Sequence, residues 1–507
     1  MNAMVPWDLL RKSLRVNAKR TALVTSDEEW TYTRLDSRSA SLAVELIGQT
    51  AAGDRVALLL GNTAEYVVAD LAVQRSGLVK VPLNPMLSAE DINYIVAAAE
   101  CSVLLMKKGI HAQSHQILEA AVAAGVTVSE LDVSGEDPVA PEAEIASTRV
   151  VDPAAPATML FTGGTTGRPK GILHSAGSVA SNYIAHVMEG EVRDGELMIL
   201  ASALSHSAGL FLLAGLTRGA TIHLTDKFDA AGYVDTIERH GLTWGSVVPT
   251  MLYRALDELE SSGRRLPSLR TLIYGSAPIT PTRLAQAVEL LGPVLIQLYG
   301  QSEVPNWGTT LSKSDHQLAQ RDPEILSSCG RPSTMVDVLI CDEEGHPVPN
   351  GTTGEICLRA PYQMVEYWRN PEATAATVVD GWVHTRDVGC LDDDGYLFIK
   401  DRLSDMIITG GYNVYSSEVE SAVQTIPAVA QVAAVGVPDP DWGEAVCAVV
   451  VLRHGFDLSE ADLLAGSRTL LSSYKRPKSI RIVPEIPVTP FGKPDKKAIR
   501  AELARSV

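Results

Sequence analysis

Apolar and polar positions alternate along the first 300 residues in blocks that predict strands and helices in turn. Short apolar runs at residues 55–60 (RVALLL) and 79–84 (VKVPLN) predict buried strands, and the stretch at 63–76 between them predicts a helix. Ser88 with Asp91 three residues later is the pattern that begins the next helix. Further strand signals are CSVLLM, LMILAS, ATIHL, LRTLIYGS and PVLIQLYG. This alternation predicts an α/β fold with largely parallel sheets.

The pattern changes after residue 400. The segment DRLSDMIITGGYNVYSSEVE leads into a predicted helix, and VAQVAAVGVPDP, AVCAVVVL and SIRIVPEI predict strands between helices. A chain of 507 residues also exceeds what one hydrophobic core usually serves. We therefore expect a large N-terminal domain of residues 1–401 and a small α+β domain of residues 402–507.

Composition excludes several classes of function. The 46% hydrophobic and 21% charged residues are ordinary for a globular protein, and no apolar run is long enough to cross a bilayer. The net charge of −18 argues against nucleic acid as a partner. The six cysteines are scattered without a C-x-x-C pair, which argues against a disulfide framework and against a zinc site. Neither end carries a targeting signal, so we expect a cytoplasmic protein.

One short segment, TGGTTGRPKG at residues 162–171, stands out for its chemistry. Glycines let backbone N–H groups approach an anion, threonines add hydroxyl donors and Lys170 adds a positive charge. Apolar runs on both sides predict that this loop joins two strands. The segment lacks the Gly-Lys pair of the common nucleotide-binding loop. The residues alone leave two interpretations open, a phosphate-binding loop and an ordinary hairpin.

Four other segments follow this loop in an order that resembles a known family. They are YGQSE at 299–303, GWVHTRDVGCLDDDGYLFIKDR at 381–402, IITGGYNVYSSEVE at 407–420 and TPFGKPDKK at 489–497. Together with the loop they resemble the motifs of the ANL adenylate-forming superfamily, which includes acyl-CoA synthetases, peptide-synthetase adenylation domains and luciferases. On these motifs the chain is identified as a member, in the acyl-CoA synthetase branch.

The resemblance implies a reaction in two halves. A carboxylate attacks the α-phosphate of ATP to form acyl-AMP and pyrophosphate, and the thiol of coenzyme A then displaces AMP. Like charges meet in the first half, so hydrogen-bond donors, Mg²⁺ and a lysine are needed to neutralise them. The expected cofactors and substrates are therefore ATP, Mg²⁺, coenzyme A and a small-molecule carboxylic acid.

The same resemblance assigns roles to the residues around the phosphates. The β- and γ-phosphates would be enclosed by Thr162, Gly163, Gly164, Thr165, Thr166, Gly167 and Lys170. Ser302 would bond the α-phosphate, Glu303 would hold Mg²⁺, and Lys493, on the mobile C-terminal domain, would sit between the attacking carboxylate and the phosphate. The alternatives are a helix-start charge for Glu303 and a solvated cation for Lys493.

Further positions are implied for the nucleoside, the acid and coenzyme A. Tyr299, next to Gly300, would stack on adenine unless it is a core aromatic. Asp387 would accept the ribose hydroxyls, and Arg402 would reach the ribose or a phosphate. His206 would lie beside the substrate carboxylate, with a core histidine as the alternative. The adenine and acyl pocket would be lined by Gly275, Ser276, Ala277 and Pro278, and the pantetheine tunnel by Gly410 and Gly411.

Two departures from the family pattern leave alternatives open. Arg386 stands where the family keeps a glycine before the ribose-binding acid, and Ser404 replaces a charged hinge residue. These departures favour one alternative, an enzyme that works mainly in thioester formation and accepts acyl-AMP from another enzyme. A second alternative is an adenylating enzyme that loads the thiol of a separate carrier protein. Nothing specific supports a luciferase, and a non-enzymatic binding protein would not need the loop, Glu303 or Lys493. The acid itself is not predicted, because the acyl pocket would be built from segments such as residues 201–209 and 304–308, whose shape the sequence does not give.

Overall fold

The computed structural model describes residues 4–135, 148–162, 168–277, 279–319, 321–453, 455–488 and 494–505. The chain divides into two compact units. Unit 1 comprises Met1–Val338 and Leu358–Val383, and unit 2 comprises Leu339–Cys357 and His384–Val507. The predicted α/β fold with a separate C-terminal α+β part is confirmed. The functional boundary expected at residue 401 stays a prediction.

A long sheet of unit 1 is parallel in its middle and antiparallel at its ends. Its spatial order is β15 (Arg331–Pro332), β14 (Thr309–Leu311), β13 (Leu295–Tyr299), β12 (Thr271–Gly275), β11 (Trp244–Val247), β9 (Leu197–Leu200), β10 (Thr221–Leu224), β1 (Thr21–Val24) and β2 (Glu29–Thr31). The strands from β13 to β1 pair in parallel. The carboxyl ends of these strands therefore meet at one edge, where ligands bind in open α/β sheets.

A second sheet of unit 1 combines parallel strands with an antiparallel hairpin. Its order is β18 (Glu366–Tyr367), β8 (Lys170–Ser175), β7 (Pro156–Thr162), β4 (Val79–Pro82), β3 (Arg55–Leu59), β5 (Cys101–Met106) and β6 (Thr127–Glu130). The strands β7 and β8 pair antiparallel, as the sequence predicts for the two sides of the loop. The apolar run 55–60 and its neighbour at 79–84 form β3 and β4.

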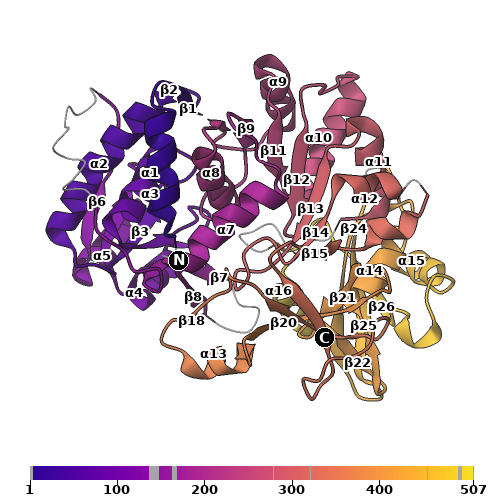
Figure 1. Ribbon diagram of the computed structural model, residues 1–507. Coiled ribbons are helices and arrows are strands. Elements are labelled where there is room, and N and C mark those ends of the chain that lie inside the picture. The colour runs from indigo at the N-terminus through magenta and orange to yellow at the C-terminus, as the bar shows by residue number, and fades with distance from the viewer. Residues whose placement is uncertain are drawn as a thin grey trace. The chain divides into compact units, whose positions relative to one another are not determined.

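Helices cover the sheets of unit 1. They are α1 (Pro6–Val16), α2 (Tyr32–Gln49), α3 (Ala64–Ser76), α4 (Ala89–Ala98), α5 (Ser114–Ala123), α7 (Ala176–Glu189), α8 (Ser207–Thr217), α9 (Ala230–His240), α10 (Pro249–Ser262), α11 (Pro281–Leu291), α12 (Lys313–Leu318), α13 (Pro371–Thr377) and the 3₁₀ turn Pro323–Ser327. Figure 1 shows α9, α10 and α11 side by side, and α3 is buried along its whole length. The Ser88 hydroxyl accepts from the Asp91 N–H and begins α4, as predicted.

Unit 2 contains the α+β module expected after residue 400. The chain passes between the units within β16 (Asp337–Cys341), β17 (Gly354–Arg359) and β20 (Trp382–Leu391), which share a sheet with β19 (Val378–Val379) and β21 (Leu397–Arg402). Its other elements are β22 (Ile407–Thr409), β23 (Tyr412–Val414), α14 (Ser416–Gln424), β24 (Val429–Asp439), β25 (Gly443–Leu452), α15 (Glu460–Ser467), the 3₁₀ turn Ser473–Lys475, β26 (Ser479–Ile482) and α16 (Lys496–Arg505). Two apolar clusters, built on the two faces of β24 and β25, form its core.

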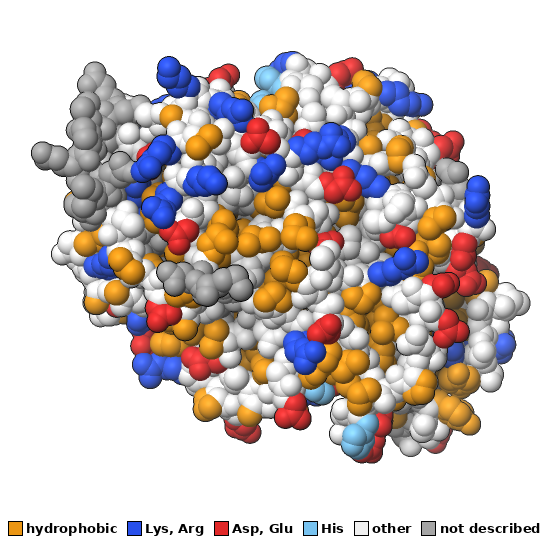
Figure 2. Space-filling view, viewed as in Figure 1, with side chains coloured by type: hydrophobic (Ala, Val, Ile, Leu, Met, Phe, Trp, Pro, Cys, Tyr) orange, Lys and Arg blue, Asp and Glu red, His pale blue; other side chains and the backbone are white. Residues whose placement is uncertain are grey.

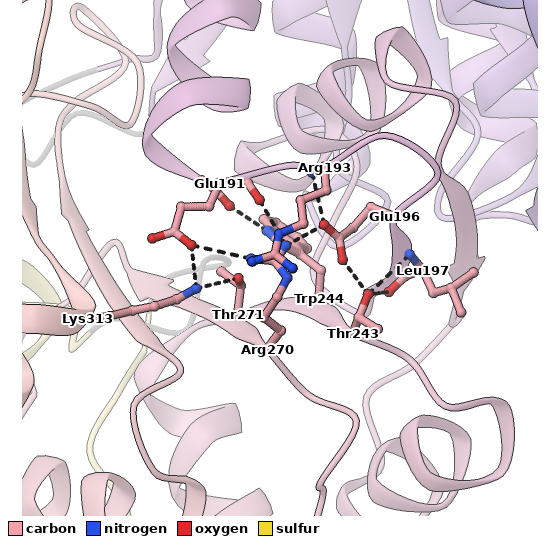
Figure 3. Close-up of polar contacts among 10 residues, drawn as sticks. Glu191, Arg193, Glu196, Leu197, Thr243, Trp244, Arg270, Thr271 and Lys313 are labelled. Atoms are coloured by element: carbon pink, nitrogen blue, oxygen red, sulfur yellow. Dashed lines mark hydrogen bonds and ion pairs between the residues drawn. The ribbon is translucent and has the colours of Figure 1, made fainter.

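A polar network fastens the amino ends of the strands in the long sheet of unit 1 (Figure 3). The Arg270 guanidinium, just before β12, donates to the backbone carbonyl of Glu191 at 2.9 Å and forms an ion pair with Glu196, just before β9. Lys313 contacts the Glu191 carboxylate at 2.6 Å and the Thr271 hydroxyl at 2.8 Å. The network thus lies at the opposite end of the strands from their carboxyl termini.

The surface charge and the hydropathy of the helices do not indicate a particular function. On the face drawn in Figure 2, Lys and Arg side chains are interspersed with Asp and Glu side chains. Within the described parts of the chain, no helix has both the length and the apolar character needed to cross a bilayer. The informative polar groups are therefore the buried ones.

One buried ion pair joins a helix to a strand inside unit 1. The Lys80 ammonium on β4 lies 2.7 Å from the Asp70 carboxylate on α3, and Asp70 is fully buried. The Gln74 amide also donates to Asp70 at 3.3 Å. Removing one partner of such a pair leaves the other charge unpaired in the core.

We predict that Asp70→Asn lowers the free energy of unfolding by about 3–5 kcal/mol, because Lys80 loses its counter-charge in a buried site. Asp337→Asn is the matched control, since Asp337 pairs with Arg359 at the surface, where such pairs contribute little. Urea unfolding of both variants measures the difference. Equal losses in the two variants would contradict a special role for the buried pair.

Candidate active site

The glycine-rich loop leaves a β-hairpin whose two ends are described. Thr162 at the end of β7 pairs with Lys170 at the start of β8. The Lys170 ammonium lies 5.1 Å from the centroid of the Tyr367 ring on β18, a cation–π distance. The residues Gly163, Gly164, Thr165, Thr166 and Gly167 lie outside the described residues, as does the side chain of Thr162. The prediction that the loop joins two strands is confirmed.

The carboxylate predicted to hold a metal lies beside the base of this hairpin. Glu303 follows β13, and its Oε1 accepts a hydrogen bond from the Tyr367 hydroxyl at 2.6 Å. The Glu303 carbonyl accepts from the Met364 N–H at 2.7 Å. Because Tyr367 contacts both Lys170 and Glu303, the cation and the carboxylate are held on the same side of the hairpin. This arrangement suits a polyphosphate with a divalent cation.

A buried histidine attaches the neighbouring residue, Ser302, to the hairpin. His174 Nε2 lies 2.9 Å from the Ser302 carbonyl. Burial lowers the pKa of His174 to about 4, so its imidazole is neutral near pH 7. A carbonyl only accepts, so the Nε2 atom carries the proton and donates it. The sequence did not identify His174 or Tyr367 as site residues. The only signal for each was its place on a short apolar segment, which for His174 lies near the glycine-rich loop.

The predicted adenine pocket lies at the carboxyl ends of adjacent parallel strands. Gly275 ends β12 and Tyr299 ends β13. A Cβ on Gly275 would lie 2.5 Å from a backbone oxygen of β13, and one on Gly300 would lie 2.7 Å from the backbone of Asn306. Both positions therefore need glycine. Ser276 has φ of 68°, a left-handed conformation, and Ala277 follows it, while Pro278 lies outside the described residues.

The segment at residues 304–308, expected to shape the acyl pocket, is tied to α7. The Asn182 amide donates to the Pro305 carbonyl at 2.9 Å. His186 Nδ1 lies 2.7 Å from the Asn182 carbonyl, and His186 Nε2 lies 2.8 Å from the Asn306 amide nitrogen. Nδ1 therefore donates and Nε2 accepts. Asn306 is left-handed with φ of 66°, so these bonds hold the segment in a conformation that the chain rarely adopts by itself.

His206 lies at the surface and not in the core. It is exposed and directly precedes α8. Its backbone carbonyl accepts from the Gly209 N–H at 3.0 Å, in the first turn of that helix. The alternative of a core histidine is therefore wrong, and a role at a ligand stays a prediction.

In unit 2, the predicted ribose-binding residues form an ion pair. Asp387 on β20 and Arg402 on β21 are opposite each other in the ladder, and Arg402 Nε lies 3.1 Å from Asp387 Oδ1. Asp387 is buried. Arg386 has φ of 61°, which is why a glycine suits this position, and its side chain is 64% exposed. The arginine therefore extends into solvent at a strain on the order of 1 kcal/mol.

The other predicted residues of unit 2 lie in turns. Gly410 and Gly411 connect β22 to β23 with φ of 57° and 80°. A Cβ on Gly410 would lie 2.6 Å from the Trp442 ring, so this turn also requires glycine. Ser404 is exposed in the turn after β21, and Lys493 lies outside the described residues.

Comparison with known proteins identifies the family. Residues 10–368 match the AMP-binding enzyme family. The chain belongs to this family. Residues 418–493 match the AMP-binding enzyme C-terminal domain. The resemblance based on the five motifs, to the acyl-CoA synthetase branch of the ANL superfamily, is therefore confirmed.

Relatives of this AMP-binding enzyme match it over nearly its whole length. A medium/long-chain-fatty-acid–CoA ligase of Mycobacterium tuberculosis is 36% identical over 97% of this chain and 89% of its own. A feruloyl-CoA synthase of an Amycolatopsis species is also 36% identical, over 97% and 98%. The solved structure of the amide bond synthetase McbA from Marinactinospora thermotolerans has a TM-score of 0.88 at 33% identity, over 98% and 99%.

The family defines the reaction at a coarse level. The predicted AMP-forming ligation of a carboxylic acid to coenzyme A, through acyl-AMP, is confirmed. ATP is consumed and AMP is released, with coenzyme A as co-substrate.

The buried histidine on α7 predicts an acid-sensitive protein. Burial lowers the pKa of His186 from 6.5 to about 3. Between pH 6.5 and pH 3, the His186 imidazole binds a proton in the unfolded chain but not in the folded one. The contribution of the neutral, buried imidazole to the free energy of unfolding is therefore present above pH 6.5 and is lost as the pH falls towards 3. We expect His186→Gln to reduce the loss of unfolding free energy between pH 7 and pH 4.5 by about 2–3 kcal/mol.

Urea unfolding at the two pH values measures this difference. The matched control is His346→Gln, which replaces a histidine whose side chain is 77% exposed. The prediction fails if wild type and His186→Gln lose the same free energy on acidification.

Proposed function

We propose that this acyl-CoA ligase forms its acyl-AMP at the base of the glycine-rich hairpin, with Lys170, Ser302 and Glu303 as the adenylation centre. The observation that carries the proposal is the shared contact of Lys170 and Glu303 with Tyr367. A carboxylate placed beside a lysine and a loop rich in N–H donors has a use when a polyphosphate and a divalent cation bind there. An ordinary hairpin would not need this arrangement.

The phosphates would be bound from two sides. The loop Thr162, Gly163, Gly164, Thr165, Thr166 and Gly167 would donate backbone and hydroxyl hydrogen bonds to the β- and γ-phosphates, with Lys170 adding charge. Ser302 would donate its hydroxyl to the α-phosphate, at the atom attacked by the substrate carboxylate. Donors fixed before the reaction stabilise the charge that develops on these oxygens.

The residues fit Mg²⁺ as the metal. Glu303 offers a carboxylate, a hard oxygen ligand, and Mg²⁺ is commonly held by one or two carboxylates together with substrate phosphates. The Tyr367 hydroxyl, which donates to Oε1, orients this carboxylate. Bound Mg²⁺ would neutralise phosphate charge. Glu303 would hold it, and Lys170 and Lys493 would supply the remaining positive charge.

The other predicted residues would bind the nucleoside, the acid and coenzyme A. Tyr299 would stack on adenine, which the glycines Gly275 and Gly300 let approach the strand ends. Asp387, paired with Arg402, would accept the ribose hydroxyls, and His206 would contact the substrate carboxylate. The backbone of Ser276, Ala277 and Pro278 would line the pocket, and Gly410 and Gly411 the pantetheine tunnel.

We also propose that residues 402–507 move as a domain about Ser404, and that the enzyme works in a reducing cytoplasm.

Coenzyme A is the thiol co-substrate of this ligase, and a separate carrier protein remains the alternative acceptor to be tested. The thioester-specialist hypothesis rests on Arg386 and Ser404 together, and the role of Ser404 stays a prediction. For Arg386 the hypothesis assumes an obstruction of adenylation. The Arg386 side chain is mostly exposed, which gives that assumption no support. The acid is a small-molecule carboxylic acid whose shape must suit the segment at residues 304–308.

We predict that Glu303→Gln lowers acid-dependent pyrophosphate release by about 10²–10³-fold, because charge stabilisation in the transition state is lost. A panel of fatty, aromatic and short-chain acids is screened with ATP, Mg²⁺ and either coenzyme A or a carrier protein. Glu366→Gln, which changes a carboxylate on β18 next to Tyr367, is the control and should keep its activity. Undiminished release by Glu303→Gln would refute the assignment.

A second prediction separates the two half-reactions. Lys493→Ala should lose about 10²–10³-fold in acyl-AMP formation while still converting supplied acyl-AMP to the thioester, because a lysine on the C-terminal domain is needed in only one of its orientations. Lys497→Ala, an exposed lysine of the same motif, is the control. Equal losses of Lys493→Ala in both half-reactions would show that the lysine is not specific to adenylation.

A further inference from the structure

Three potential metal ligands come together on the small sheet of unit 2. Glu355 and Cys357 are two residues apart on β17, so their side chains lie on the same face of the strand. His384 lies on β20, with its Nδ1 atom 2.9 Å from Glu355 Oε2 and 3.6 Å from Cys357 Sγ. All three ligand atoms lie within 4.8 Å of one another. The absence of a C-x-x-C pair had argued against any such site.

These distances resemble those around a tetrahedral ion. Zinc–sulfur and zinc–nitrogen bonds of about 2.3 and 2.0 Å place a thiolate and an imidazole nitrogen about 3.5 Å apart. The sulfur and nitrogen atoms are already at 3.6 Å. The carboxylate oxygen and the nitrogen need to move apart by only a few tenths of an ångström to admit an ion.

The burial of the cluster is uneven in a way that suits a metal site. Cys357 is fully buried, whereas the side chains of Glu355 and His384 are each 16% exposed. An ion can therefore reach the cluster from the carboxylate and imidazole side.

We propose that Glu355, Cys357 and His384 form a binding site for Zn²⁺, separate from the Mg²⁺ site at Glu303. Thiolate, imidazole and carboxylate together are a ligand set for zinc, whereas Mg²⁺ takes oxygen ligands. Three protein ligands leave a fourth position for water or for a further thiol.

A backbone contact orients the carboxylate for this role. Glu355 Oε1 accepts the N–H of Arg386 at 2.9 Å, which leaves Oε2 directed at His384. Partners of this kind position ligands and increase metal affinity. The Thr385 hydroxyl also donates to the Ile356 carbonyl at 2.7 Å. The ion would therefore cross-link β17 and β20 at a point three residues before Asp387 on β20.

Binding of Zn²⁺ by a neutral His384 imidazole and the Cys357 thiol changes the protonation of both groups. In the absence of the ion, the Nδ1–H group donates to Glu355. On binding, Nδ1 gives its lone pair to the metal, and its proton is replaced, through exchange with water, by one on Nε2. The Cys357 thiol loses its proton to solvent. One proton is thus released for each ion bound.

Cobalt titration of the full-length protein tests this site, with Co²⁺ as a spectroscopic substitute for Zn²⁺. After dialysis against a chelator, wild type should bind about one equivalent, with a thiolate-to-cobalt charge-transfer band that Zn²⁺ abolishes by displacement. Cys357→Ser should lose the band. Cys390→Ser, which changes a thiol on the same strand as His384, should keep it.

Two further variants keep the test decisive if Cys357→Ser folds poorly. His384→Gln and Glu355→Gln should each weaken Co²⁺ binding by about tenfold or more, with circular dichroism spectra like that of wild type. Zn²⁺ should raise the thermal midpoint of wild type and not that of His384→Gln. The proposal is overturned if wild type shows no charge-transfer band, if the band survives in Cys357→Ser, or if Cys390→Ser loses it. Unaltered Co²⁺ affinity in both His384→Gln and Glu355→Gln would overturn it as well.

Discussion

The hydrogen bonds that attach Ser302 to the glycine-loop hairpin, and Glu303 to the strand β18 beside it, are the constraint on which the proposed active site of unit 1 depends. Ser302 and Glu303 follow the end of β13 in one sheet, whereas the hairpin belongs to the other. The His174 imidazole binds the Ser302 carbonyl, and the Tyr367 hydroxyl binds the Glu303 carboxylate. A phosphate loop and a metal-binding carboxylate can cooperate only at a fixed separation. These two bonds, with the Met364 N–H on the Glu303 carbonyl, hold that separation.

The rest of unit 1 keeps the strand ends in place for this attachment. At the carboxyl edge, Gly275 and Gly300 leave no room for a side chain, so backbone from neighbouring strands can pack directly. At the amino edge, Arg270, Glu191 and Glu196 satisfy one another in the network of Figure 3. The polar groups of the proposed active site and those of the network in Figure 3 are therefore at opposite ends of the same parallel strands. This division is expected where helix-covered sheets bind ligands at one edge.

Glu355 connects two features of unit 2 that differ in chemistry. One of its oxygens accepts the N–H of Arg386, in the left-handed residue before Asp387, and the other faces His384 and Cys357. An ion bound by these residues would stiffen the strand that carries Asp387. This placement links the proposed zinc site, through one carboxylate, to the strand that carries the proposed ribose-binding residue Asp387.

The sequence by itself determined the elements, the fold class and the family. Apolar periodicity is read within one short segment and indicates which strands and helices are buried. The elements β3, α3 and β4 and the two strands beside the loop were therefore predictable. The motifs likewise singled out Glu303, Asp387 and Arg402 as candidate site residues, because each lies in a short continuous segment; their roles stay predictions. Only the tertiary structure decided which of these residues meet.

His174 and Ser302 are 128 residues apart, and Tyr367 and Glu303 are 64 apart. Glu355, Cys357 and His384 form a cluster only because β17 and β20 are in the same sheet. Periodicity records that a residue is buried, but it carries no information about which distant strand will pair with its own. The sequence therefore could not provide the contacts between sheets and between strands. For the same reason it could not predict the cluster of Glu355, Cys357 and His384.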